Sequence, residues 1–235
     1  MAGLPEIRAG DDLVELISAA VDVEDGDVVV LAQKIVSKAE GRVVRLEEIQ
    51  PSDSAREIAG DEQDPRRIEA ILREAKRVVR IRKPLVIAET RQGFICASAG
   101  VDASNAPEPG MLVLLPEDAD ASAERLRERF QEVTGRTVGV LVSDSFGRPW
   151  RQGTIDVALG AAGIEVMRDL RGRRDRVGYE LHATMIAVAD EIASAAELVM
   201  GKLDAIPAAV VRGLDVAGDG HARDLVIPEE RDLFR

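Results

Sequence analysis

The sequence predicts an α+β fold in which helices pack against mixed or antiparallel sheets. No helical pattern interrupts a run of four strand-like segments, near 78–82, 85–88, 94–98 and 112–115. Strands that follow one another without a crossover helix usually pair antiparallel. The amphipathic helical patterns lie before and after this run, and such segregation of helices from strands along the chain is typical of α+β proteins.

The first forty residues predict a helix followed by a buried strand. Asp11 and Asp12 precede apolar residues at helical spacing over 13–20, where the acidic charges face the positive end of the helix dipole. After a turn, residues 28–32 have the sequence Val-Val-Val-Leu-Ala. A short, continuous apolar run with β-branched residues is typical of a strand that is buried on both faces.

Capping signals predict three further helices. Ser54 and Glu57 have the spacing of a capping box, and Asp64 stands before a proline at the first position of a helix. Asp120 is expected to cap a helix that ends at Gly135, because glycine readily takes the left-handed conformation that is common just after a helix.

The second half of the chain predicts a strand, a long helix and a last strand. The apolar run 138–142 is typical of a buried strand, and we expect it to end in a polar loop. Residues 182–200 have the longest helical pattern, with Gly201 as its stop, and 207–211 form a last apolar strand. No linker, repeat or low-complexity segment interrupts these elements.

Composition and charge exclude two classes of protein. Hydrophobic residues make up 46% of the 235 residues, so the chain can bury a substantial core and is not disordered as a whole. The formal net charge is −12. A surface that wraps nucleic acid needs the opposite sign, and we therefore expect no nucleic-acid partner.

Cysteine usage and apolar segments indicate the compartment. The single cysteine, Cys96, cannot form an intrachain disulfide, which suits a reducing cytoplasm. Zinc sites of four cysteines, or of two cysteines and two histidines, are also excluded. The N-terminus has no signal-peptide pattern, and no window approaches the ~20 apolar residues of a membrane span. We expect a cytoplasmic protein without membrane contact.

The common nucleotide and nucleophile motifs are absent. There is no P-loop and no G-x-S-x-G motif, and Gly218-Asp-Gly220 does not continue into the dinucleotide fingerprint. The two histidines, taken singly, are more often surface or core residues than general bases. Any acid, base or metal role is therefore expected to fall to carboxylates.

Two carboxylate segments follow predicted strands. Asp102, Ser104 and Asn105 come directly after one strand, and hard cations take such oxygen ligands. An Asx-turn explains the same residues and is favoured by spacing alone. Asp144 follows the strand 138–142, at the kind of strand end where α/β-type sheets bind ligands. A turn or a helix cap explains Asp144 equally well.

Several basic residues lie beside these carboxylates in the sequence. Arg148 and Arg151 flank a rigid Pro-Trp step, and guanidinium groups bind phosphate or carboxylate bidentately. Lys34 and Lys38 follow the strand 28–32 and are further candidates for phosphate contacts. These positive islands on an acidic chain favour an anionic small-molecule ligand, although solvated helix faces explain charge runs more often.

Six segments together resemble one enzyme family. They are LPEI at 4–7, QKIVSKAEG at 33–41, GVDASN at 100–105, SDSFGRPWR at 143–151, ADEIASAAELVMG at 189–201 and VVRG at 210–213. In these segments, which run from Leu4 to near the tail, the chain resembles the coenzyme F420-0:L-glutamate ligase family.

The resemblance implies a GTP-dependent ligase that adds L-glutamate to the lactyl carboxylate of the deazaflavin precursor F420-0, and further glutamate through its γ-carboxylate. It implies an acyl-phosphate intermediate, Mg²⁺ or Mn²⁺ as the divalent metal, and potassium as a further ion. A two-lobed α+β fold, a single ligase domain over 1–235 and an intertwined homodimer are expected. Some relatives carry a C-terminal nitroreductase-like domain, and we expect a stand-alone ligase here.

The resemblance also implies roles for particular residues. Asp102, Asp144 and the hydroxyl of Ser145 match the metal ligands, whereas no catalytic side chain is assigned and Arg148 and Arg151 remain candidate anion contacts. Where some members have an acidic residue, this chain has Lys202, which leaves no carboxylate there for a second metal. The residues that match GTP contacts are Leu4, Pro5, Glu6, Ile7, Gln33, Lys34, Lys38, Asn105, Met200, Gly201 and Lys202.

Two other functions can use the same segments. A GTP-sensing binding module would bind the nucleotide without consuming it. A metal-dependent phosphohydrolase would consume the nucleotide without an acceptor. Phosphate release with and without the coenzyme precursor and glutamate distinguishes these functions from a ligase.

Overall fold

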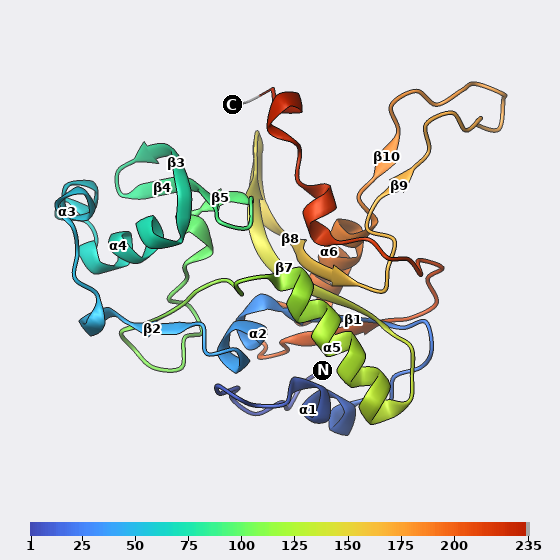
Figure 1. The fold of residues 1–235 in the computed structure, drawn as a ribbon, viewed down its shortest axis with the longest axis horizontal. Helices are drawn as coiled ribbons and strands as arrows, with labels where there is room; N and C mark the ends of the chain where they lie inside the picture. Colours follow the sequence, from blue (N-terminus) through green and yellow to red (C-terminus); the bar gives the residue numbers. More distant parts are fainter. Residues whose placement is uncertain (234–235) are drawn as a thin grey trace.

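A four-stranded mixed sheet forms the centre of the molecule. The structure is a computed structural model, and it describes residues 1–233. The strand order is β11-β1-β7-β8; β1 pairs parallel with β7, whereas the two outer pairs are antiparallel (Figure 1). The bounds are Val28–Ala32 for β1, Gly139–Arg148 for β7, Arg151–Ala162 for β8 and Ala208–Val211 for β11.

Helices cover both faces of this sheet, because β1 is apolar on both sides. Val29 and Leu31 belong to a core cluster with α1, α2 and α5, whereas Val28 and Val30 belong to a cluster with α6. Figure 1 shows α5 lying across one face of the sheet and α6 behind it. The bounds are Leu13–Ala20 for α1, Gln33–Ala39 for α2, Ala119–Thr134 for α5 and Val188–Met200 for α6.

A second hydrophobic core lies beside the central sheet. It is built from α3, α4, a three-stranded antiparallel sheet β3-β4-β5 and the two-stranded pair β2-β6 (Figure 1). The rings of Phe94 and Phe146 meet edge to face at 6.3 Å, between β5 and β7. The bounds are Val43–Arg45, Asp53–Ala59, Pro65–Glu74, Ala75–Arg82, Leu85–Thr90, Ile95–Ala97 and Met111–Val113 for β2, α3, α4, β3, β4, β5 and β6.

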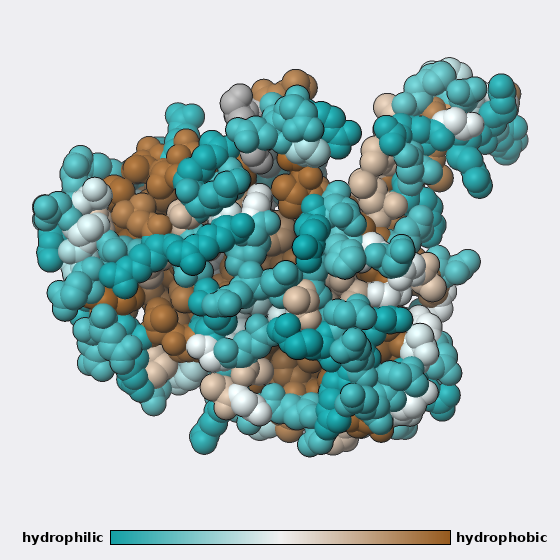
Figure 2. Space-filling model, viewed as in Figure 1, coloured by the Kyte–Doolittle hydropathy of each residue, from teal (hydrophilic) through white to brown (hydrophobic). Residues whose placement is uncertain are grey.

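These two cores agree with the predicted two-lobed α+β fold. The predicted single domain over 1–235 extends two residues beyond the described part and stays a prediction. A short ribbon of β9 (Arg168–Asp169) and β10 (Met185–Ile186) supports an arm that projects from the sheet, and Figure 2 shows that this arm is mostly hydrophilic. Single 3-10 turns lie at Leu46–Glu48, Ser98–Gly100, Ala222–Leu225 and Glu229–Arg231. Across residues 1–233, none of the helices has the length and apolar character to cross a membrane.

Several predicted elements are confirmed by the structure. Asp12 caps α1 and Asp64 caps α4, each by accepting bonds from backbone N–H groups of the first turn. The strands predicted at 28–32 and 207–211 correspond to β1 and β11. Gly135 has φ +69° and ends α5 in the left-handed conformation.

Four sequence predictions are wrong in detail. Ser52 rather than Ser54 caps α3, and Asp118 rather than Asp120 caps α5. The helix predicted over 182–200 begins only at Val188. The strand predicted over 138–142 does not end in a loop, because β7 continues to Arg148 in a ladder with β8, a strand that was not predicted.

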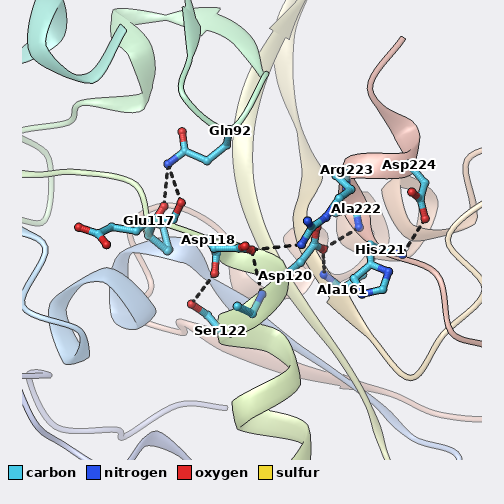
Figure 3. Close-up of polar contacts among 12 residues, drawn as sticks. Gln92, Glu117, Asp118, Asp120, Ser122, Ala161, His221, Ala222, Arg223 and Asp224 are labelled. Carbon is cyan, nitrogen blue, oxygen red and sulfur yellow. Dashed lines mark hydrogen bonds and ion pairs between the residues drawn. The ribbon is translucent and has the colours of Figure 1, made fainter. Parts of the chain in front are cut away.

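Asp120 holds the start of α5 to two distant segments instead of capping the helix. Its Oδ1 accepts hydrogen bonds from Ala161 N at 2.9 Å and from Ala222 N at 2.7 Å, and its Oδ2 accepts one from Arg223 Nε at 2.9 Å (Figure 3). At Gly160 a Cβ atom would lie 2.0 Å from the carbonyl oxygen of Ala119, so the helix approaches β8 too closely for a side chain. The buried carboxylate therefore joins α5, β8 and the C-terminal segment.

We expect Asp120→Asn to lower the free energy of unfolding by about 2 to 4 kcal/mol, because an amide group would face the Arg223 donors and leave buried donors unpaired. Asp118→Ala is the matched control and should cost about 1 kcal/mol, as the loss of an N-cap does. Urea unfolding measures both values. Equal destabilisation by the two variants would contradict the assigned role of Asp120.

Candidate functional site

A cavity of about 310 Å³ opens where β1 ends. Ala32 is the last residue of β1 and pairs with Ser143, after which the chain turns into α2 while β7 continues alongside β8. The N-terminal segment, the start of α2, β7, β8 and the loop after α6 form the walls. The lining residues are Leu4–Ile7, Ala32–Ile35, Lys38, Asn105, Ser143–Ser145, Asp156, Glu197, Met200–Leu203 and Ala205–Pro207.

The structure brings the sequence-predicted nucleotide residues together in this cavity. All eleven residues that match GTP contacts line it, as do Asp144 and Ser145. Asp102 does not line the cavity itself, but its Oδ2 is 2.8 Å from Nζ of the lining residue Lys34. The roles of these residues remain predictions, but the segments that carry them form one continuous surface.

Arg148 and Arg151 do not line the cavity. They lie at the end of the β7-β8 hairpin, whose turn residue Trp150 has φ +57° and is 82% exposed. Arg148 Nη2 donates to the carbonyl oxygen of Gln152 at 3.3 Å. Their assignment as anion contacts stays a prediction, without support from a shared pocket.

Lys34 and Asp102 form an ion pair at the edge of the cavity. Asp102 Oδ1 accepts from Ser104 N at 2.8 Å, and Oδ2 accepts from Ser104 Oγ at 2.7 Å. Burial opposes ionisation of Asp102, but the bonds from Lys34 and Ser104 outweigh it and lower the pKa of this carboxyl to about 2. Asp102 is therefore ionised at neutral pH, and the Asx-turn bond to Ser104 N coexists with the ion pair.

At Asp144 the effect of burial outweighs the groups that favour the ionised carboxylate. Burial raises the pKa of its carboxyl to about 6, and the nearby charge of Asp156 raises it further, whereas Lys34 and Lys202 and a bond from Ser145 N lower it. The opposing charges are too weak to restore the ordinary pKa. An additional cation beside Asp144 would therefore stabilise the ionised carboxylate.

Asp156 is a site residue that sequence reasoning missed. It is 5% exposed, lies opposite Ser145 in the β7-β8 ladder, and accepts a hydrogen bond from Ser145 Oγ at 2.5 Å. Its other oxygen accepts from Ser143 Oγ at 2.9 Å. Because β8 was not predicted, no spacing in the sequence brought Asp156 to Ser145.

Two buried polar groups suit an anionic or acceptor-rich ligand. Lys38 is 6% exposed, and its Nζ lies 2.5 Å from Oε1 of the exposed Glu6. Gln33 is fully buried; its Oε1 accepts from Ser37 Oγ at 2.8 Å, whereas its Nε2 has no hydrogen-bond partner. A buried donor left unpaired costs roughly 1 to 3 kcal/mol, which an acceptor atom of a ligand would recover.

The donor set fits a hard divalent cation that shares its coordination with a substrate. Within residues 1–233, no group of three or more His, Cys, Asp and Glu side chains gathers into a metal cage. Asp144 and the Ser145 hydroxyl are oxygen donors on adjacent residues, and the Lys34 ammonium already acts on both Asp102 and Asp144. Mg²⁺ typically takes one or two protein carboxylates and completes its shell with water and phosphate oxygens.

A second cavity of about 650 Å³ adjoins the first. The two share Glu6, Ile7 and Lys38, so these residues form the wall between them. Arg8 and Arg45 bring positive charge to the second cavity, although Arg45 Nη2 is paired with Glu108 at 3.2 Å. The two cavities together offer room for a ligand larger than a nucleotide alone.

Comparison with known proteins identifies the family. The family model described as F420-0:Gamma-glutamyl ligase matches residues 3–213. The chain is 48% identical to the coenzyme F420:L-glutamate ligase of Methanopyrus kandleri, over 98% of this chain and 94% of the relative. It is 48% identical to the enzyme of that name from Archaeoglobus fulgidus, over 99% and 94%, and 45% identical to that from Methanothermobacter thermautotrophicus, over 99% and 96%. Because the match spans nearly the whole chain and includes every residue that lines the cavity, the chain belongs to the F420-0:gamma-glutamyl ligase family.

Proposed function

We propose that this chain ligates L-glutamate to coenzyme F420-0 with GTP as the cosubstrate and Mg²⁺ or Mn²⁺ as the metal. The observation that supports it most is the convergence of four distant segments, at 4–7, 33–38, 143–145 and 200–202, on one cavity in a member of this family. The relatives' names give the substrates F420 and glutamate. The nucleotide and the metal are proposed from the side chains in the cavity.

The cations of the cavity suit the phosphates of GTP. Lys34 and Lys38 are each held by a carboxylate, Asp102 and Glu6, so both ammonium groups are fixed in place before a ligand arrives. A phosphate oxygen can accept a charge-assisted hydrogen bond from either lysine. The unpaired Nε2 of Gln33 adds a neutral donor for another acceptor of the nucleotide.

Asp144 and Ser145 would hold the metal, with Asp102 close by. When bound, Mg²⁺ or Mn²⁺ supplies charge neutralisation at the phosphate oxygens. The coenzyme carboxylate takes the γ-phosphoryl group of GTP, and GDP leaves. The glutamate amine then attacks the acyl carbon, the bond from that carbon to the phosphate oxygen breaks, and phosphate leaves as the amide forms. No protein nucleophile takes part in this sequence.

Phosphate release distinguishes the proposed ligase from the two alternatives. With GTP, Mg²⁺, F420-0 and L-glutamate present, we expect phosphate and a product one glutamyl residue heavier by mass spectrometry. Omitting glutamate or F420-0 should stop steady phosphate release. Phosphate release that continues without either acceptor would indicate a phosphohydrolase, and nucleotide binding with no turnover in the complete mixture would indicate a sensor.

Asp144→Asn is expected to abolish ligation and to stabilise the metal-free protein. The folded pKa of about 6 lies above the ordinary value of 3.8, so above that pH the buried charge destabilises the fold, and removing it relieves the cost. A magnesium titration of activity and thermal unfolding at pH 8 without metal measure the two effects. If Asp144→Asn ligated glutamate at the parent rate at any magnesium concentration, the assignment of Asp144 to the metal would be refuted.

Lys38→Met is expected to weaken GTP binding about 10- to 150-fold, because it removes a charge-assisted contact worth roughly 1.5 to 3 kcal/mol while keeping the buried stem. Glu6→Gln is the matched comparison: it keeps the Lys38 ammonium but removes the carboxylate that holds it, so GTP affinity should fall less than in Lys38→Met. Calorimetric titration with GTP measures both. A defect of Lys38→Met confined to the KM for glutamate would contradict the assignment.

The homodimer and the potassium ion stay predictions. Near the cavity, Leu198, Val199 and Leu203 are exposed apolar residues, and Leu203 also lines the cavity. This surface is a reasonable place for a second copy to pack, and it would bring the partner close to the bound substrates.

A further inference from the structure

The hydrogen bond from Ser145 to Asp156 fixes which way the Ser145 hydroxyl points. A serine hydroxyl has one hydrogen and two lone pairs. In the 2.5 Å contact between the two side chains, Ser145 Oγ donates its one hydrogen to Asp156 Oδ1. What remains on Ser145 Oγ is acceptor capacity alone. A residue in the cavity wall whose hydroxyl can only accept is suited to a cation.

Asp156 is itself held rigidly. Its Oδ2 accepts from Ser143 Oγ at 2.9 Å, and its backbone carbonyl oxygen accepts from Ser194 Oγ of α6 at 2.8 Å. In the ladder, Ser145 pairs with Asp156 directly across the two strands. The carboxylate is therefore held by hydroxyls of β7 and its backbone by α6, so the geometry at Ser145 does not depend on a ligand.

The charge of Asp156 has no cationic partner among the described residues. No lysine or arginine side chain within residues 1–233 lies in ion-pair distance of its carboxylate, which is buried in the cavity wall. A contact that served only to join β7 to β8 would be made as well by apolar side chains, without the cost of burying a charge. Metal sites, in contrast, commonly place a carboxylate behind a ligand, where it orients the ligand.

We propose that Asp156 is a positioning residue that orients Ser145 as a neutral oxygen ligand for the divalent cation beside Asp144. The proposal rests on the proposed function, because it concerns the metal of that same site. Asp144 would contact the cation, and Asp156 would be a second carboxylate that contacts the ligand Ser145, at a position that the sequence did not indicate. Asp156 acts through Ser145 and need not touch the cation.

A double-mutant cycle on metal affinity tests this inference. Free Mn²⁺ is measured by electron paramagnetic resonance while the substrate-free protein is titrated, for the parent, Ser145→Ala, Asp156→Ala and the double variant. We expect each single substitution to weaken Mn²⁺ binding about 10- to 100-fold, the range found when outer partners of metal ligands are removed. The double variant should bind only as weakly as Ser145→Ala, within about threefold, because Asp156 then has no ligand to orient.

Two controls separate orientation from loss of structure. Ser143→Ala removes the other hydroxyl bonded to Asp156 but keeps the bond from Ser145, so it should weaken Mn²⁺ binding less than either single substitution of the cycle. Ser145→Thr keeps a hydroxyl and should restore binding. Where Asp156→Ala does not fold, as judged by its thermal transition without metal, Asp156→Val takes its place in the same cycle, because valine suits a strand and offers Ser145 no acceptor.

Three results would overturn the inference. The first is an Asp156 variant that binds Mn²⁺ as tightly as the parent. The second is a double variant whose loss of Mn²⁺ affinity is the product of the two single losses. The third is a parent protein that does not bind Mn²⁺ at millimolar concentration. The cycle uses no GTP, coenzyme or glutamate. A chain that shows the coupling but does not ligate glutamate would therefore refute the proposed function alone, and a chain that ligates glutamate without the coupling would refute this inference alone.

Discussion

The pairing of β1 with β7 stops at Ala32, and the position of the site depends on that offset. β1 turns into α2 opposite Ser143, whereas β7 continues for five more residues with β8 as its neighbour. Along this stretch no strand of the described residues is hydrogen-bonded to the edge of β7 that faced β1. Side chains from the N-terminal segment, from α2 and from the loop after α6 surround it instead, and they enclose the cavity.

The electrostatics of the cavity combine fixed cations with an undercompensated negative charge. Lys34 and Lys38 have carboxylate partners, so the free protein keeps both ammonium groups near the cavity at little cost. Asp144 lacks an equivalent cationic partner, and its raised pKa reflects the free-energy cost of burying its negative charge. A divalent cation that arrives with a phosphate-bearing ligand would supply the positive charge that Asp144 lacks. Such a cation would also offset the repulsion between a polyanionic ligand and a chain with a net charge of −12.

Local signals in the sequence predict the elements whose causes are local. Asp12 and Asp64 cap their helices, and the apolar run at 28–32 is a strand buried on both faces. Asp118 and Asp120 are both reasonable caps for α5, and only the distant contacts of Asp120 with β8 and the C-terminal segment decide between them. Sequence spacing cannot contain that information, because the bonding partners are 41 and 102 residues away.

The same limit explains which site residues were found. The family resemblance assigns most residues of the cavity, whereas Lys34 and Lys38 are candidate phosphate contacts from their position after a strand. Spacing alone leaves Asp102 and Asp144 open between a turn and a ligand. β8 begins with exposed polar residues and glycine, and its long pairing with β7, rather than a hydrophobic pattern, makes it a strand. Asp156 was missed with it. A carboxylate that contacts a residue across the ladder can be placed beside it only when the ladder is known.

The cavity walls come from segments spread between Leu4 and Pro207, and this has a thermodynamic consequence. No part of the chain can form the walls by itself, since β11, β1, β7 and β8 must all be in register first. The free energy of ligand binding is therefore linked to the unfolding of the whole central sheet and not to that of one loop. Amide hydrogens that exchange only when the whole sheet opens, including those far from the ligand, would exchange more slowly in the complex, because a bound molecule raises the free energy of that opening.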